Sequence, residues 1–192
     1  MYNMQRKNET LVNRLKKGEK KAMEELYDTY SPVLLGISMR YCDCREDAED
    51  LLHESLIKII RGIKDFQETF QGSFEAWMKR ITVNNCLGAL RKKMELVRLN
   101  GNENIKDETE NDEDYELPIT SAEPQFVIEM IQTLPVGYRT VLNLYVFEKM
   151  SHKEIASSLN ISENTSKSQL SKARSMLRKK MISVRKLQES VK

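Results

Sequence analysis

The sequence predicts an all-α protein made of two small helical domains joined by a flexible acidic linker. A chain of 192 residues with 40% hydrophobic composition can bury one or two small cores, and only seven glycines and four prolines argue against a mainly β protein. Apolar residues recur at helical spacing on both sides of one segment that lacks periodicity. We therefore expect domains over residues 1–98 and 124–192, with the linker at 99–123.

Four helices are expected in the first domain. The first ends before Pro32 and the second follows it, since proline interrupts helices. The third spans residues 45–62, with acidic residues in its first turns and a glycine as its stop, and the fourth begins near Ser73. The stripes expected to be buried are Met23, Leu26, Tyr27 and Tyr30, then Leu34, Ile37 and Tyr41, then Ala48, Leu52, Leu56 and Ile59.

Charge is distributed unevenly along the chain. Residues 100–124 contain one lysine against nine acidic residues, a local charge of −8 in a chain whose total is +2. A segment this polar buries too little apolar surface to offset the conformational entropy lost on ordering. It is therefore predicted to be a flexible linker. From residue 164 onward nine lysines and arginines face the single acid Glu189, and this basic end is suited to a polyanionic partner.

The second domain is expected to begin with two short helices, the second starting at Pro135, and to end in a helix-turn-helix. Ser151 and Glu154 have the spacing of a capping box, Asn160 permits a turn, and Ser162 can cap the next helix. The expected buried residues are Val127, Met130, Ile131, Leu134, Tyr138, Val141, Leu142 and Tyr145, then Ile155, Ala156 and Leu159, then Ser166, Leu170, Ala173 and Leu177.

In a helix-turn-helix the start of the second helix enters the major groove, while basic side chains contact phosphates. The residues predicted to face base edges are Thr165, Lys167, Ser168 and Ser171, and those predicted to face phosphates are Lys172, Arg174 and Arg178. A solvated basic helix is the alternative, but the capping box, the turn and the basic charge together favour DNA binding.

Aromatic residues gather before the linker, in residues 64–93. Phe74, the only tryptophan, Trp77, and Ile81 have helical spacing and are expected in the core. The preceding loop and following helix combine aromatic, amide and cationic groups, which together hold unstacked single-stranded bases. The candidates for such contacts are Phe66, Gln67, Phe70, Gln71, Ser73, Lys79, Arg80, Asn84 and Arg91.

Three motifs occur in a fixed order: "AEDLLHESL", then "SFEAWMKRITVN", then, after the acidic linker, "LPVGYRTVLNLYVFEKMSHKEIASSLNISENTSKSQLSKAR". With them the chain closely resembles bacterial RNA polymerase sigma factors of the extracytoplasmic function (ECF) group of the sigma-70 family, from Leu11 to Leu177. The resemblance implies that the first domain docks on the polymerase clamp and melts the minus-ten element, and that the second binds the minus-thirty-five element. It also implies that linker acids, including Asp112, Glu113 and Asp114, enter the polymerase channel.

The resemblance also suggests residue roles. It assigns the loop from Phe70 to Ser73 to a pocket for a flipped promoter base. Two residues depart from the family pattern: Gly88 stands where many relatives carry Asp, and Ser166 where a β-branched apolar residue is common, so the recognition helix is expected to seat slightly differently on its core. The residues implied to contact polymerase are Asp47, Glu49, Asp50, Leu51 and Glu54.

Two other kinds of protein would share some of these features. A helix-turn-helix regulator with an N-terminal ligand or dimerisation domain would share the C-terminal domain but would need neither the aromatic loop nor "AEDLLHESL". A metal-dependent enzyme or sensor would use Cys42, Cys44, Cys86 and His53, but Cys-x-Cys lacks the usual zinc spacing. No catalytic constellation is apparent, so we expect no enzymatic activity, cofactor, metal site or small-molecule substrate.

The expected location is the cytoplasm, because the first residues lack the apolar core of a signal peptide and the three cysteines lack disulfide spacing. The expected partners are core RNA polymerase, promoter DNA and an anti-sigma factor. A membrane-anchored form of that factor is left open. The resemblance suggests no role for residues 181–192.

Overall fold

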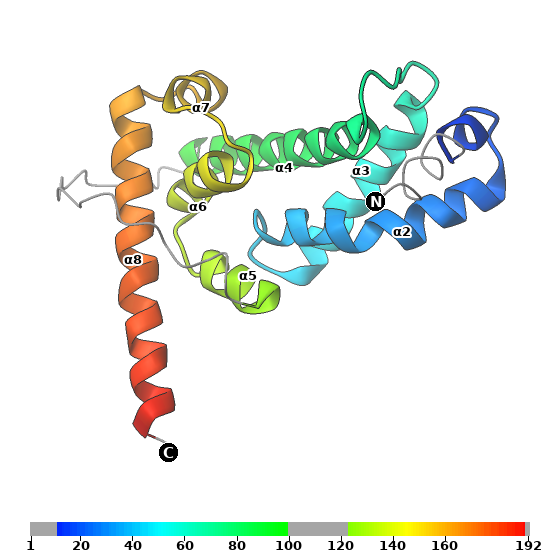
Figure 1. Ribbon diagram of the computed structural model, residues 1–192. Helices are drawn as coiled ribbons and strands as arrows, with labels where there is room; N and C mark the ends of the chain where they lie inside the picture. The colour runs from blue at the N-terminus through cyan, green and yellow to red at the C-terminus, as the bar shows by residue number, and fades with distance from the viewer. Residues whose placement is uncertain (1–10, 100–122, 191–192) are drawn as a thin grey trace. The chain divides into compact units, whose positions relative to one another are not determined.

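The computed structural model describes residues 11–99 and 123–190, and every regular element within these ranges is a helix (Figure 1). The all-α prediction is therefore confirmed. The chain divides into two compact units, residues 1–102 and 103–192, and the division lies inside the predicted linker. Residues 100–122, which include Asp112, Glu113 and Asp114, lie outside the described residues.

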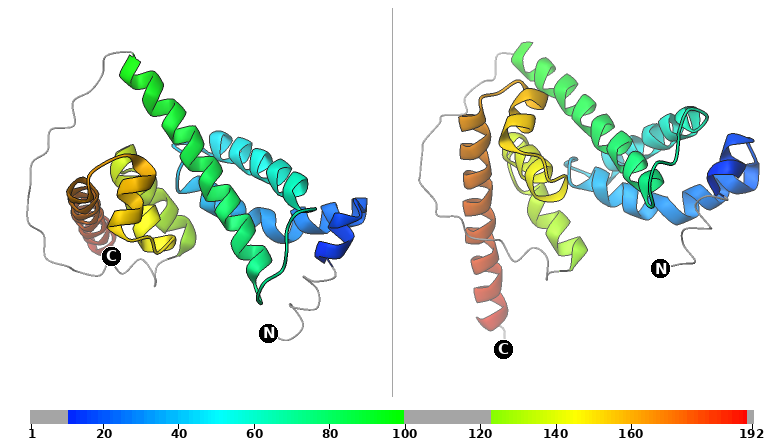
Figure 2. Two further views of the ribbon diagram at one scale, coloured as in Figure 1. Left: turned by 90° about the horizontal axis from the view of Figure 1, so that it is seen from above. Right: turned by 45° about the horizontal axis from the view of Figure 1, so that its top comes forward.

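The first unit consists of three long helices that pack against one another, preceded by a short helix over residues 11–16 (Figure 2). Helix α4 contacts both α2 and α3. The helices are α2 (Lys20–Met39), α3 (Arg45–Gly62) and α4 (Ser73–Leu99). Their shared core includes Leu26, Leu34, Ala48, Leu52, Ile59, Phe74, Met78 and Leu87.

The predicted break at Pro32 is wrong, because α2 continues through it. Proline removes one backbone hydrogen bond, but Pro32 lies on the exposed side, and the buried stripe continues in helical register past it. Burial along this stripe offsets the lost bond. Tyr27 was expected in the core, yet it is 47% exposed. Its neighbour Leu26 lies in the buried stripe, so Tyr27 points away from it. The stripe comprises Ala22, Leu26, Tyr30, Leu34 and Ile37.

Helix α3 has the predicted bounds, and its predicted stripe of Ala48, Leu52, Leu56 and Ile59 is buried. A polar contact fixes its register against α4. The amide of Asn85, only 6% exposed, donates to the Leu51 carbonyl and to Ser55 Oγ, both at 3.2 Å, and its oxygen accepts from Lys58 Nζ. Buried amides need such partners, so this contact permits one arrangement of the two helices.

An aromatic cluster closes the connection between α3 and α4. The Phe66 ring lies 5.4 Å from Phe74 and 4.9 Å from Trp77, measured between centroids, and Phe74 lies 5.9 Å from Tyr30. Gly62 allows Trp77 to approach, since a Cβ there would lie 3.1 Å from the indole. The core prediction for Phe74 is confirmed, and Trp77 packs beside it.

The second unit packs its last and longest helix against α6 and α7. The chain after Pro135 is helical as predicted, but a π-helical turn ends that stretch. Arg139, only 1% exposed, is buried there and donates to the Gln132 carbonyl. The elements are α5 (Pro124–Gln132), α6 (Val136–Leu142), η2 (Asn143–Phe147), α7 (His152–Leu159) and α8 (Glu163–Ser190).

The predicted helix-turn-helix is present. Ser151 Oγ accepts from the Glu154 N–H, and the Glu154 carboxylate accepts from the Ser151 N–H at 2.8 Å. Asn160 adopts the left-handed conformation, with φ 54°, and Ser162 Oγ accepts from the Thr165 N–H at 2.9 Å. The buried residues are Ile155, Ala156, Ser166, Leu170, Ala173 and Leu177, whereas Leu159 is half-buried.

Replacing Pro32 with alanine tests the continuous α2. Pro32→Ala restores a helical N–H, so the first unit should gain about 1 to 3 kcal/mol in free energy of unfolding. Trp77, the only tryptophan, reports urea unfolding of this unit by fluorescence. Pro135→Ala, in the other unit, should leave the urea midpoint of the Trp77 fluorescence transition unchanged. A lower midpoint for Pro32→Ala would show that proline favours the native helix.

The capping box makes a pH-dependent prediction. Hydrogen bonds from the Ser151 side chain and then its backbone hold the pKa of Glu154 below its ordinary value. Its stabilisation is therefore present above about pH 4.3, the ordinary value, and is lost as pH falls through the lower folded pKa. In amide hydrogen exchange, Glu154→Gln should reduce protection of the Ile155 amide at pH 7, with a smaller difference below about pH 4. Glu163→Gln should leave Ile155 unchanged, and a pH-independent loss in Glu154→Gln would contradict this account.

Candidate functional site

The outward face of α3 gathers most of the predicted polymerase contacts. Asp47, Asp50 and Glu54 are exposed and spaced by three and four residues, so they share one side of the helix. Glu49 lies at the edge of the core and pairs with Arg45 at 2.7 Å. The sequence interpretation missed Ile57, 48% exposed, which continues this side. Extending the same spacing by one step would have found it.

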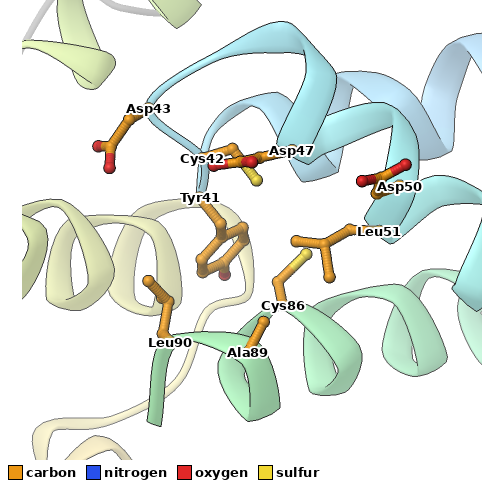
Figure 3. A pocket seen from close by; sticks show the side chains of 9 residues that line it. All are labelled: Tyr41, Cys42, Asp43, Asp47, Asp50, Leu51, Cys86, Ala89 and Leu90. Atoms are coloured by element: carbon orange, nitrogen blue, oxygen red, sulfur yellow. The ribbon is translucent and has the colours of Figure 1, made fainter. Parts of the chain in front are cut away.

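A hollow of about 200 Å³ lies beside this face, between α3, α4 and the chain that precedes α3 (Figure 3). The thiols of Cys42 and Cys86 line it, together with aliphatic side chains and carboxylates. An acidic, partly apolar hollow favours a cationic side chain over an anion. Its lining consists of Tyr41, Cys42, Asp43, Asp47, Asp50, Leu51, Cys86, Ala89 and Leu90.

Among the residues that the structure describes, no three His, Cys, Asp or Glu side chains are grouped as metal ligands would be. Cys44 is exposed, whereas Cys42 and Cys86 are buried. A backbone hydrogen bond with Asp47 lowers the pKa of Cys44, but desolvation and the carboxylates of Glu46 and Asp47 raise it overall. A raised pKa leaves less of the reactive thiolate.

The loop before α4 exposes only part of the predicted single-strand contacts. Phe70 is 63% exposed and Gln71 is also exposed, at a turn where Gly72 has φ +82°. Phe66 is buried in the aromatic cluster. Ser73 is buried as well, and its Oγ accepts from the Thr69 N–H at 3.3 Å. The side chains of Phe66 and Ser73 therefore hold the loop from within instead of facing outward.

Along α4, Arg80, Asn84 and Arg91 are exposed at spacings of four and seven residues, so the structure brings these three onto one side. Lys79 lies on a neighbouring side and pairs with Glu75 at 2.7 Å. At Gly88, a Cβ would meet nothing within 4 Å, so no close contact requires glycine there.

On α8 the predicted DNA contacts form two neighbouring strips. One contains Thr165, Ser168 and Lys172, and the other contains Lys167, Ser171, Arg174 and Arg178. Lys167 is exposed and the others are half-buried. The Thr165 and Ser168 side chains are held locally, since Thr165 Oγ1 lies 2.8 Å from Ser162 Oγ and Ser168 Oγ donates to the Thr165 carbonyl. A locally held hydroxyl presents a defined pattern to DNA bases.

Comparisons with known proteins match both units. The family model for sigma-70 region 2 matches residues 26–95, and the model for sigma-70 region 4 matches residues 127–177. The ECF RNA polymerase sigma-E factor of Haemophilus influenzae is 29% identical over 184 residues, covering 90% of this chain and 94% of that protein. The ECF sigma factor SigW of Bacillus subtilis is 29% identical over 178 residues, covering 88% and 94%.

A solved structure of CnrH in complex with the cytosolic domain of CnrY has a TM-score of 0.46 and 19% identity, covering 91% of this chain and 96% of that one. None of the described helices combines the length and apolar content that a membrane crossing requires.

A helix-turn-helix regulator would share only the second unit, so it does not account for the region 2 match. With both regions in order and relatives of one kind along nine-tenths of its length, the chain belongs to the sigma-70 family as an ECF sigma factor, which binds core RNA polymerase and directs promoter recognition and transcription initiation.

Proposed function

We propose that the first unit of this sigma factor docks on the polymerase clamp and opens the minus-ten element, while the second unit binds the minus-thirty-five element. The observation that supports this most is the exposure of Phe70. Its ring is 63% exposed, although the other aromatic residues of the same stretch, Phe66, Phe74 and Trp77, pack together. A large exposed aromatic ring on an anchored loop favours stacking on an unpaired base.

Promoter opening is assigned to the loop and the adjacent side of α4. Flipping a base costs a few kcal/mol, and stacking on an aromatic ring returns about 1 to 3 kcal/mol per base. Phe70 and Gln71 supply the contacts to the base, while Arg80, Asn84 and Arg91 contact the strand backbone. Lys79 remains in this proposed surface once DNA competes with its Glu75 partner.

Polymerase docking is assigned to the outward face of α3. Asp47, Asp50 and Glu54 steer a basic partner surface, and Ile57 supplies apolar area that is removed from water on binding. The adjacent hollow, with Leu51 in its wall, accommodates a basic side chain of the partner. Glu49 orients Arg45 at the edge of this surface.

The protein itself performs no catalysis in this proposal, and the polymerase supplies the chemistry. We place its action in the cytoplasm, where the polymerase works, and propose an anti-sigma factor as the partner that holds it inactive. Phe66 and Ser73, which were predicted to contact DNA, keep only a supporting role for the loop, because both side chains are buried.

The promoter-opening role is tested by Phe70→Ala. This change should leave association with core polymerase intact and reduce initiation on duplex promoters roughly tenfold, the equivalent of about 1.4 kcal/mol of stacking. Templates mismatched across the minus-ten element should restore much of the activity, because their minus-ten bases are already unpaired before the protein binds. Glu68→Gln, an exposed change in the same loop, serves as the control. Equal loss on duplex and mismatched templates would exclude base capture by Phe70.

The two predicted roles on α8, phosphate contact and base reading, are separated by salt dependence and base preference. Lys172→Ala should weaken holoenzyme binding to all minus-thirty-five sequences and reduce the slope of log affinity against log salt by about one unit. Lys167→Ala should instead change which sequences are preferred. Lys153→Ala, an exposed lysine on α7, should alter neither property. An unchanged sequence preference in Lys167→Ala removes that residue from the reading surface.

A further inference from the structure

A buried polar contact joins the two helices of the helix-turn-helix. Ser166 is fully buried, and its Oγ lies 2.9 Å from His152 Nδ1. His152 is the first residue of α7, directly after the capping residue Ser151. A buried hydroxyl on α8 thus has a hydrogen-bonding partner on α7.

Aromatic contacts extend this junction. The Tyr145 ring, from η2, stacks on the His152 imidazole with centroids 4.8 Å apart and planes 24° from parallel. The Arg174 guanidinium, from α8, lies over the Tyr145 ring, 5.7 Å from its centroid and within cation–π range. We call Tyr145, His152, Ser166 and Arg174 the junction cluster. The junction cluster joins η2, α7 and α8. Its two members on α8, Ser166 and Arg174, lie about two helical turns apart.

We infer that His152 is a positioning residue for minus-thirty-five recognition, which acts by fixing the rotation of α8 through Ser166. The inference rests on the proposed function of α8, because Ser166 stands between the proposed reading residues Thr165 and Lys167. A rotation of roughly 10° moves a side-chain tip about 8 Å from the helix axis by about 1.4 Å. Recognition groups work only when held to about 0.5 Å, so a small rotation alters base contacts.

The chemistry of this contact differs from that of an apolar one. An apolar side chain at residue 166 would pack without directional preference, and the helix could turn slightly at little cost. A hydrogen bond between two side chains weakens steeply as its angle departs from linear, and stacking by Tyr145 restricts the imidazole plane. Tyr145 also restrains Arg174, so less side-chain freedom is lost when that residue contacts a phosphate.

Four variants test the inference in the holoenzyme. Ser166→Thr and Ser166→Val introduce side chains of the same shape, but only threonine keeps the hydroxyl. His152→Phe keeps a ring for Tyr145 but removes Nδ1, and the fourth variant combines His152→Phe with Ser166→Val. Each is assayed for base preference on a library of minus-thirty-five variants, together with polymerase association and thermal unfolding.

Ser166→Thr should retain the wild-type base preference. Ser166→Val and His152→Phe should each change the ratio between the best and competing sequences by roughly fivefold, the ratio that corresponds to one net hydrogen bond. The double variant should change it no more than either single variant, because both remove the same contact. Polymerase association should be unchanged in all four variants, since the changes lie in the second unit.

The inference is overturned if Ser166→Val matches Ser166→Thr in base preference, or if both single variants lower transcription uniformly across the library and lower the melting temperature, as a merely structural contact would. Effects of the single variants that multiply in the double variant also overturn it, since they would be independent. Lys167→Ala separates the two proposals. If it changes base preference while His152→Phe does not, only the positioning role fails, whereas no change in either variant removes the reading surface as well.

Discussion

The aromatic cluster of the first unit is the contact on which the rest of that unit depends. It joins Tyr30 of α2, the Phe66 loop anchor, and Phe74 and Trp77 of α4, and Gly62 at the end of α3 gives the indole room. Aromatic pairs at these centroid distances add about 0.5 to 1.5 kcal/mol each beyond area burial. Because the cluster fixes the loop at both ends, Phe70 can remain exposed without the loop collapsing onto the core.

Polar contacts then select one arrangement among those that the apolar packing would allow. Asn85 ties α3 to α4 in the first unit, and His152 with Ser166 ties α7 to α8 in the second. Each contact lies directly behind a proposed functional face, with Asn85 bonded to the carbonyl of Leu51 and Ser166 beside Lys167. Apolar burial supplies most of the stability, whereas these directional bonds set the rotation of the helices that present the faces.

Much of this fold could be predicted from local sequence patterns. Helical spacing located α3, and short-range capping chemistry located the turn between α7 and α8, because the interacting residues lie within four positions of each other. The break at Pro32 was mispredicted, since a local rule could not include the burial that continues past it. Burial of Phe66 and Ser73 depended on contacts across the tertiary fold, and the contact between His152 and Ser166 required the structure as well. Ile57 could have been found from helical spacing alone, since it continues the side of α3 that carries Asp50 and Glu54.

In the proposed function, the distribution of charge predicts that neither unit binds DNA strongly by itself. Nonspecific affinity grows with the number of phosphates neutralised, and the proposed DNA faces carry three basic residues on α4 and four on α8, several of them half-buried or paired. Such small sets give only modest nonspecific affinity to either unit alone. Joining two weak contacts on one polymerase multiplies their effect, because the second contact forms at a high effective concentration. In the proposed function, specificity therefore comes from the requirement that both promoter elements be engaged together, and the face of α3 assigned to the polymerase is acidic whereas the faces assigned to DNA are basic.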